Sequence, residues 1–254
     1  MDIERLKTET QATLMRDRLV LLGLFAVGLL CATGLYYSAP ELSAKDQAIL
    51  YSFPDTPRKM SATIGVIDRY VEATPVFVVL SYTFLYVFLQ SFSVPGTVLL
   101  NVMAGALFGF VPAFLLVSFC AGTGACGCYL LVAAFGKGMV LRCFPGLLLK
   151  FHQKVQRHQH NLLWYMLSIR VAPIVPKWFT SLASPIVGVP LSTYATATYI
   201  GLMPMNVITV GIGKAISTVK TLQGLEPQHF AILLLIGVLL LLPTLCSRKQ
   251  TKEE

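Results

Sequence analysis

The feature that most constrains the fold of this chain is a set of long apolar runs, of which the first is LVLLGLFAVGLLCATGLYYS at residues 19–38. As an α-helix, about 20 residues span roughly 30 Å, which is the thickness of the hydrocarbon core of a bilayer. Over the whole chain 55% of the residues are hydrophobic and 13% are charged, whereas about 25% are charged in a typical soluble domain. We therefore expect an integral membrane protein.

Inside a bilayer every backbone N–H and C=O group needs a partner within the protein, so only helices or a closed barrel can cross it. The length of the apolar runs favours helices and predicts an all-α, polytopic membrane protein. Arginines precede the first run, whose apolar part is longer than that of a signal peptide, and this favours an uncleaved anchor. The expected full spans are Leu19–Ser38, Pro75–Phe92, Pro112–Phe135, Pro190–Val210 and Phe230–Leu245.

These runs divide the chain into consecutive segments. We expect an N-terminal segment at 1–18, a first membrane anchor at 19–38, an extramembrane connection with an amphipathic helix at 39–73, a membrane domain at 74–220, a last membrane helix at 229–246 and a basic tail at 247–254. Basic residues flank the first and the last span on their outer sides, so the positive-inside rule predicts that both termini are cytoplasmic. An odd number of spans contradicts that orientation, and the segment 75–92 is therefore suspected to be re-entrant.

The first informative motif in the membrane domain is FSVPGTVLLNVMAGALFGF. We expect Pro95 to stop the incoming helix, Gly96 to allow a sharp turn and Thr97 to cap a new helix. Gly105 and Gly109 would give that helix a face of small residues for close packing. The motif predicts a re-entrant helical hairpin, with an ordinary proline-kinked span as the alternative.

A second motif of the same kind is NLLWYMLSIRVAPIVPKWF, in the second half of the membrane domain. The apolar run before the prolines is too short to span a bilayer, Pro173 and Pro176 break it, and a further short piece begins at Lys177 and Trp178. This predicts a second re-entrant hairpin. Two interrupted apolar segments at corresponding positions are typical of transporters whose binding site lies between structural repeats.

Charge is distributed unevenly over the membrane domain. Between Ala73 and Leu225 there is no Asp or Glu, which excludes paired catalytic carboxylates, a carboxylate metal site and an acidic proton relay from this part of the chain. The same part of the chain contains the basic residues Lys137, Arg142, Lys150, Lys154, Arg157, Arg170, Lys177, Lys214 and Lys220.

Arg170 is the basic residue with the most apolar surroundings. Its insertion into the membrane would cost about 2.5 to 3.5 kcal/mol, which backbone carbonyls, water or an anion from outside the protein must offset. The anion that a bilayer offers is a phospholipid phosphate, whose oxygens match the planar guanidinium. The alternative is a structural role, in which Arg170 caps carbonyls freed by Pro173 and Pro176; Lys177 and Lys214 are expected to extend towards water.

The segment between the two motifs, residues 135–161, ends in a predicted basic amphipathic helix that would lie on an anionic membrane surface. His158 and His160 would diverge on a helix, and the six cysteines lack the spacing of a metal site or a disulfide framework, so no metal or cofactor is expected. The helix would have Leu147, Leu148, Phe151 and Val155 on one side and Lys150, Lys154, Arg157 and His158 on the other.

Three of these stretches carry a family resemblance: PGTVLLNVMAGALFG at 95–109, FGK at 135–137, and RVAPIVPKWF with the SP that follows at 184–185. Together they resemble the DedA/VTT superfamily of membrane proteins, most closely its transmembrane protein 41 branch, over roughly residues 75–219. The resemblance implies an endoplasmic-reticulum protein with two facing re-entrant hairpins. These hairpins would be formed by Pro95, Gly96, Gly105, Gly109, Arg170, Pro173, Pro176 and Trp178.

The function that the resemblance implies is passive movement of phospholipids between leaflets, in support of lipid homeostasis and autophagosome formation. Its partners would be membrane phospholipids, above all anionic headgroups, and autophagy or lipid-handling proteins; no nucleic acid is expected. Thr97 stands where bacterial members have an acid, which argues against proton coupling. Two alternatives remain, a secondary transporter of a small anion or phosphorylated lipid carrier and a non-transporting scaffold, while the lack of a nucleophile–base pair argues against an enzyme.

Overall fold

The computed structural model describes residues 14–40, 43, 46, 48–49, 65–66, 69–172 and 176–221. The chain divides into two units, Met1–Lys214 and Ala215–Glu254, and of the second unit only the end of one helix is described. The expected last span at 229–246, the basic tail and most of the connection at 39–73 lie outside the described residues.

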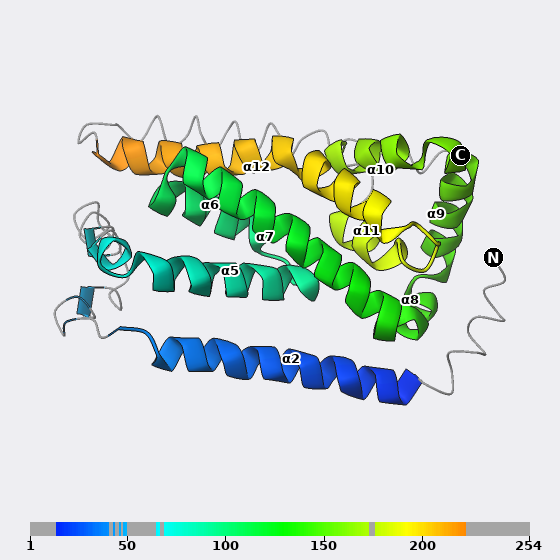
Figure 1. Cartoon of the computed structure of the whole chain (residues 1–254), viewed down its shortest axis with the longest axis horizontal. Helices are drawn as coiled ribbons and strands as arrows, with labels where there is room; N and C mark the ends of the chain where they lie inside the picture. Colours follow the sequence, from blue (N-terminus) through cyan, green and yellow to red (C-terminus); the bar gives the residue numbers. More distant parts are fainter. Residues whose placement is uncertain are drawn as a thin grey trace, which may run out of the picture. The chain divides into compact units, whose positions relative to one another are not determined.

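All regular elements in the described part of the chain are helical, which confirms the predicted all-α class. Among the described residues, three helical segments are long and apolar enough to cross a membrane, at Leu14–Tyr37, Phe110–Cys143 and Leu191–Thr218. The elements are α2 (Leu14–Tyr37), α5 (Pro75–Ser91), α6 (Thr97–Phe108), α7 (Phe110–Leu131), the π-helix η1 (Val132–Gly136), α8 (Lys137–Cys143), α9 (Pro145–Arg157), the 3-10 helix η2 (Gln159–Asn161), α10 (Leu162–Val171), α11 (Lys177–Ala183) and α12 (Leu191–Thr221) (Figure 1).

Helix α5 is the segment that was suspected to be re-entrant. It has 17 residues, so it is about 26 Å long at 1.5 Å per residue, slightly shorter than the hydrocarbon core. The helix that follows it, α6, has 12 residues and is too short to cross. The structure contains no membrane, and the re-entrant character of both hairpins stays a prediction.

Helices α5, α6 and α7 carry large apolar side chains on their outer faces, and α6 and α7 carry several small residues on their buried faces. Large apolar side chains on the outer faces are 61% to 70% exposed, as at Leu80, Val76 and Val111. This arrangement suits lipid, because helices in a bilayer associate through close backbone packing rather than by hiding apolar side chains from water. The small buried residues of α6 and α7 include Ala104, Ala113, Cys120, Ala121 and Ala125.

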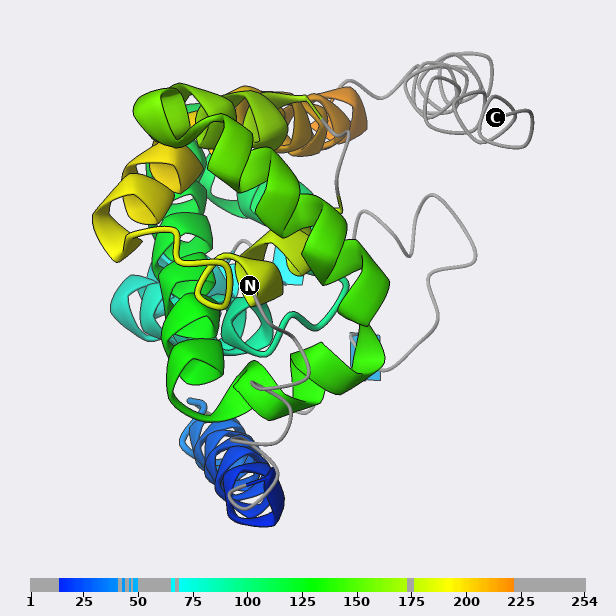
Figure 2. The same ribbon diagram turned by 90° about the vertical axis from the view of Figure 1, so that its right-hand side faces the viewer.

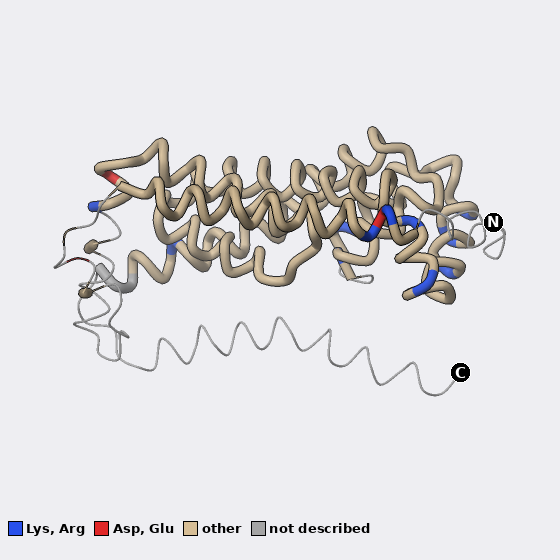
Figure 3. The backbone as a smooth tube through the Cα atoms, turned by 90° about the horizontal axis from the view of Figure 1, so that it is seen from below, with Lys and Arg blue, Asp and Glu red and all other residues tan. Residues whose placement is uncertain are grey.

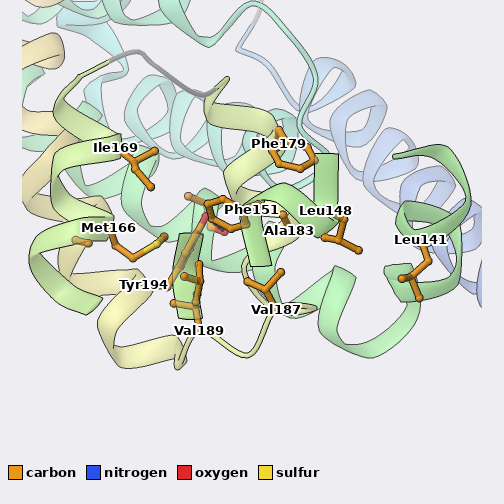
Figure 4. Packing of buried hydrophobic residues seen from close by; sticks show 13 residues of the cluster. Leu141, Leu148, Phe151, Met166, Ile169, Phe179, Ala183, Val187, Val189 and Tyr194 are labelled. Atoms are coloured by element: carbon orange, nitrogen blue, oxygen red, sulfur yellow. Dashed lines mark hydrogen bonds between the residues drawn. The ribbon is translucent and has the colours of Figure 1, made fainter. Parts of the chain in front are cut away.

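A separate core cluster joins α8, α9, α10, α11 and the start of α12 (Figure 4). Its central side chains are at most 3% exposed and include Phe151, Met166, Phe179 and Tyr194. Helix α9 runs across the direction of α7 and α12 rather than along it (Figures 1 and 2). The cluster therefore attaches α9 to the short helices α10 and α11.

The chain from α5 to α12 contains two halves with the same order of elements. In each half a helix ends at a break, a short helix follows, and a long helix completes the half: α5, α6 and α7 in the first, α10, α11 and α12 in the second. The short helix of each half packs on the long helix of the other half: α6 packs on α12, and α11 packs on α7. This exchange brings both breaks close to the long helices.

Candidate functional site

The first break lies between α5 and α6. The backbone N–H groups of Ser93 and Val94 donate to the carbonyl oxygens of Gln90 and Leu89, at 3.1 and 2.8 Å. Ser93 has a φ of 54°, so this is a Schellman motif with a serine in the left-handed position that glycine usually fills. The helix is closed before Pro95 is reached, and the expectation that Pro95 stops it is wrong.

Gly96 makes the sharp turn that was expected. Its φ is 126°, it is the N-cap residue of α6, and its carbonyl oxygen accepts the N–H of Leu99 at 2.9 Å. Thr97 does not cap the helix, contrary to expectation, because Gly96 is the N-cap residue and Thr97 is already the first helical residue. The sequence motif therefore located the turn correctly but misassigned the cap by one residue.

The two glycines expected to form a packing face have different roles. Gly105 lies where α6 crosses α12, and a Cβ atom there would overlap the carbonyl oxygen of Val210. Gly213 faces Val102 in the same way, so two backbones touch. Gly109 is outside this contact and has a φ of 77°; it ends α6 and precedes α7. Gly105 therefore lies in the same helix crossing as Gly213, and Gly109 does not.

The second break lies between α10 and α11, at the position that the prolines predicted. Ala172 leaves the helix with an extended backbone, as a residue before a proline should. Pro176 has a φ of −55° and a ψ of 130° and is the N-cap residue of α11, which begins at Lys177. Pro173 itself lies outside the described residues.

Arg170 lies in the last turn of α10 and is only 3% exposed. Its Nη2 donates to Ser181 Oγ at 3.3 Å, and its guanidinium carbon lies 4.8 Å from the centre of the Tyr194 ring, which is a cation–π contact. Among the described residues, Nε and Nη1 have no hydrogen-bond partner. No described carbonyl accepts a bond from this side chain, so the structural capping role finds no support there.

The charge of Arg170 is also uncompensated within the described part of the chain. The ion pairs there join Arg16 with Asp17 and Arg69 with Asp46. The charged group that does interact with Arg170 is Lys177, a second cation. Burying an ion without a counter-ion costs several kcal/mol even after the surroundings relax. Within the described part of the chain, Arg170 therefore has two free N–H donors and no counter-ion.

The first break contacts α7 at residues 124–128, and so does the cluster formed by Arg170, Ser181 and Tyr194. From the first break, Ser93 Oγ lies 3.2 Å from Cys128 Sγ. From the second half, the Tyr194 hydroxyl lies 3.3 Å from the Ala125 carbonyl oxygen and donates to Ser181 Oγ at 2.8 Å. The sequence offered no signal for these four side chains, because Ser, Cys and Tyr occur throughout membrane helices.

A second polar cluster connects α5, α6, α7 and α12. The Tyr86 hydroxyl donates to Asn101 Oδ1 at 2.9 Å, and Asn101 Nδ2 donates to Thr209 Oγ1 at 3.0 Å. Asn206 accepts from Asn101 at 3.4 Å and donates to Ser118 Oγ at 3.3 Å. Sequence reasoning missed this network, although an asparagine in an apolar helix is itself a signal for a buried partner.

A groove of about 250 Å³ lies between α9 and the start of α11. Pro176 and Trp178, both expected in the second hairpin, line this groove, and the ring centre of Trp178 is 5.4 Å from that of Phe144. Neither Arg170 nor the first turn lines the groove. The lining residues are Leu147, Lys150, Phe151, Lys154, Pro176, Trp178 and Phe179.

Comparison of the chain with known proteins identifies its family. The family model of the VTT domain matches residues 94–215, which include Pro95 and Gly96 of the first break, the whole second break and Arg170. The Transmembrane protein 41 homolog of Caenorhabditis elegans is 30% identical over 97% of this chain and 100% of its own length. An uncharacterized membrane protein of Arabidopsis thaliana is 34% identical over 90% of this chain and 80% of its own.

Transmembrane protein 41B of Homo sapiens is 29% identical over 91% of this chain and 79% of its own length. None of the solved structures compared matches the chain. The apolar helices are those of a membrane protein, and the similarity to the Caenorhabditis elegans protein covers nearly the whole chain. The chain is therefore a member of the VTT-domain family of membrane proteins, together with the transmembrane protein 41 proteins.

Proposed function

We propose that this protein is a passive phospholipid scramblase, which moves phospholipids between leaflets without ATP. The observation that carries the proposal is Arg170, a buried cation with two nitrogens unpaired among the described residues. The membrane domain contains no carboxylate that can neutralise it. A lipid phosphate offers both the charge and the paired oxygens that a guanidinium binds best.

The two breaks supply the rest of the path. Ser93 beside the first break and Ser181 after the second add hydroxyl groups on either side of the same turn of α7. A headgroup that crosses along these groups exchanges water for fixed polar partners, while its chains remain in lipid. In this proposal phospholipids move only along their own concentration gradient. The membrane domain has no acidic residue that could couple the movement to a proton gradient.

We further propose that the protein resides in the endoplasmic-reticulum membrane with both termini in the cytoplasm, and that it supports lipid homeostasis and autophagosome formation. The family resemblance suggests the organelle and the cellular role. For the N-terminus there is also a charge argument: Lys and Arg gather at the end of the first unit that carries α8 and α9 (Figure 3), and α2 starts at that end. The positive-inside rule assigns such an end to the cytoplasm.

The decisive experiment uses the purified full chain in liposomes that contain a fluorescent phospholipid in both leaflets. A membrane-impermeant quencher should extinguish the label of both leaflets when protein is present, without ATP or an ion gradient, and only that of the outer leaflet in protein-free liposomes. Dependence on a gradient would favour a secondary transporter. Movement of neither lipid nor solute would favour a scaffold.

The role of Arg170 is tested in the same assay by a matched pair of variants. Arg170→Ala should slow the movement of lipid more than Lys214→Ala, which removes an exposed cation from the membrane domain. Both variants are compared at equal amounts of folded protein. Equal rates would remove Arg170 from the mechanism.

A further inference from the structure

The groove between α9 and the start of α11 combines two cations with an apolar floor. The floor is formed by Phe151 and Phe179, which are both 3% exposed and belong to the core cluster of Figure 4. Their rings meet edge to face, with centres 6.0 Å apart. Because these rings are packed on several other side chains, the floor is already formed in the absence of a ligand.

The two cations are Lys150 and Lys154, and helical geometry explains why both line the groove. Lys150 and Lys154 are one helical turn apart, as are Leu147 and Phe151, so all four side chains lie on neighbouring rows of α9. Leu147 was expected on the buried side but is 52% exposed, and it borders the groove with the lysines. No described residue forms an ion pair with either lysine.

The size of the groove limits what it can hold. Pockets for drug-sized ligands measure about 300 to 1,000 Å³, so a groove of about 250 Å³ accommodates a phosphate group and the first part of a chain rather than a whole lipid. Two of the lining residues are exposed apolar side chains, Leu147 at 52% and Trp178 at 42%. Tryptophan is enriched where a membrane meets water.

We propose that this groove binds one anionic phospholipid, with its phosphate between Lys150 and Lys154 and the start of an acyl chain against Leu147 and Trp178. Charge complementarity favours an anion, because the groove and the membrane domain around it hold no carboxylate. The apolar floor and rim favour a lipid over a free phosphate. Since Arg170 does not line the groove, this binding is independent of lipid movement between leaflets and stands even if the protein does not scramble lipids.

The experiment uses Trp178 as its own reporter. The chain has two tryptophans, and Trp164→Phe leaves Trp178 as the single one. The full chain is placed in nanodiscs of phosphatidylcholine with increasing fractions of phosphatidylserine that carries brominated chains, which quench nearby indoles. Brominated phosphatidylserine should quench Trp178 at a lower mole fraction than brominated phosphatidylcholine does.

A double variant identifies the binding residues. Lys150→Gln with Lys154→Gln should weaken the apparent affinity for phosphatidylserine roughly 25-fold, since each lysine near an anionic lipid contributes about a fivefold increase in binding. The control is Arg142→Gln with Arg157→Gln, which removes the same charge from the same basic region but outside the groove, and which should keep the preference. Circular dichroism confirms equal folding of both variants.

Three outcomes would overturn the proposal. Equal quenching by both lipids would show that the groove does not select anionic lipid. An equal loss in the control variant would assign the preference to the basic surface as a whole. Displacement of the lipid by soluble glycerophosphoserine, which has no chains, would show that the groove takes a free phosphate ester. The liposome assay of lipid movement is run separately, so failure of this proposal and of the scramblase proposal can be told apart.

Discussion

The hydroxyl group of Tyr194 donates to Ser181 Oγ at 2.8 Å, while the face of the same ring lies 4.8 Å from the guanidinium carbon of Arg170. Ser181 in turn accepts a hydrogen bond from Arg170 at 3.3 Å. The three side chains come from α10, α11 and α12 and form a closed triangle. Tyr194 thus orients the cation without neutralising it, which leaves the charge available to an anion.

Tyr194→Phe should keep the ring beneath Arg170 and remove the two hydrogen bonds of the hydroxyl group. We expect a loss of about 1 to 2 kcal/mol in the free energy of unfolding, together with slower lipid movement because Ser181 no longer holds Arg170 in place. The control is Tyr199→Phe, which removes a 2.8 Å hydrogen bond to Thr123 on α7 but none near Arg170. If this control slows lipid movement equally, Tyr194 does not position the arginine.

Arg170→Met should separate function from stability. Methionine has a similar length and no charge, and a buried ion without a counter-ion costs several kcal/mol, a cost that the substitution removes. We therefore expect an unchanged or higher thermal midpoint and lipid movement slower by about tenfold or more, equivalent to the loss of one charge-assisted hydrogen bond. A large fall in the thermal midpoint would instead identify Arg170 as a structural lock.

Ser93→Gly should stabilise the protein by about 1 kcal/mol, because the left-handed conformation costs a non-glycine residue about 1 to 2 kcal/mol and the lost contact with Cys128 is worth less. Ser91→Gly, two residues earlier and within α5, should destabilise it by about 0.5 to 1 kcal/mol. Thermal unfolding in detergent measures both. Changes of the same sign would contradict the Schellman closure of α5.

Gly105→Ala and Gly213→Ala should each destabilise the protein by about 1 to 3 kcal/mol, because the added methyl group overlaps a backbone carbonyl of the facing helix. Gly23→Ala is the matched control in α2, where a methyl group would meet nothing within 4 Å; it should be neutral or stabilising by up to about 1 kcal/mol. Unfolding followed by circular dichroism gives the comparison. Unchanged stability in Gly105→Ala would mean that α6 and α12 do not touch as closely as the structure has them.

Local chemistry alone was enough to predict the helical membrane class and the two breaks. A backbone in lipid has to bond to itself, so the long apolar runs had to be helices. Gly96 tolerates a positive φ, and Pro176 restricts its own φ and lacks an N–H, so both act on the chain whatever surrounds them. The excess of positive charge was equally evident, because it depends only on composition.

The tertiary structure decided which residues meet. Packing decides that Gly105 and Gly213 lie in one helix crossing and that Tyr194 lies beside Arg170. It also places Trp178 in the groove beside α9, and the structure shows that Ser93 closes α5. Spacing along a single helix predicts neighbours three and four residues apart. It cannot predict contacts between residues far apart along the chain, because these follow from how closely whole helices approach one another.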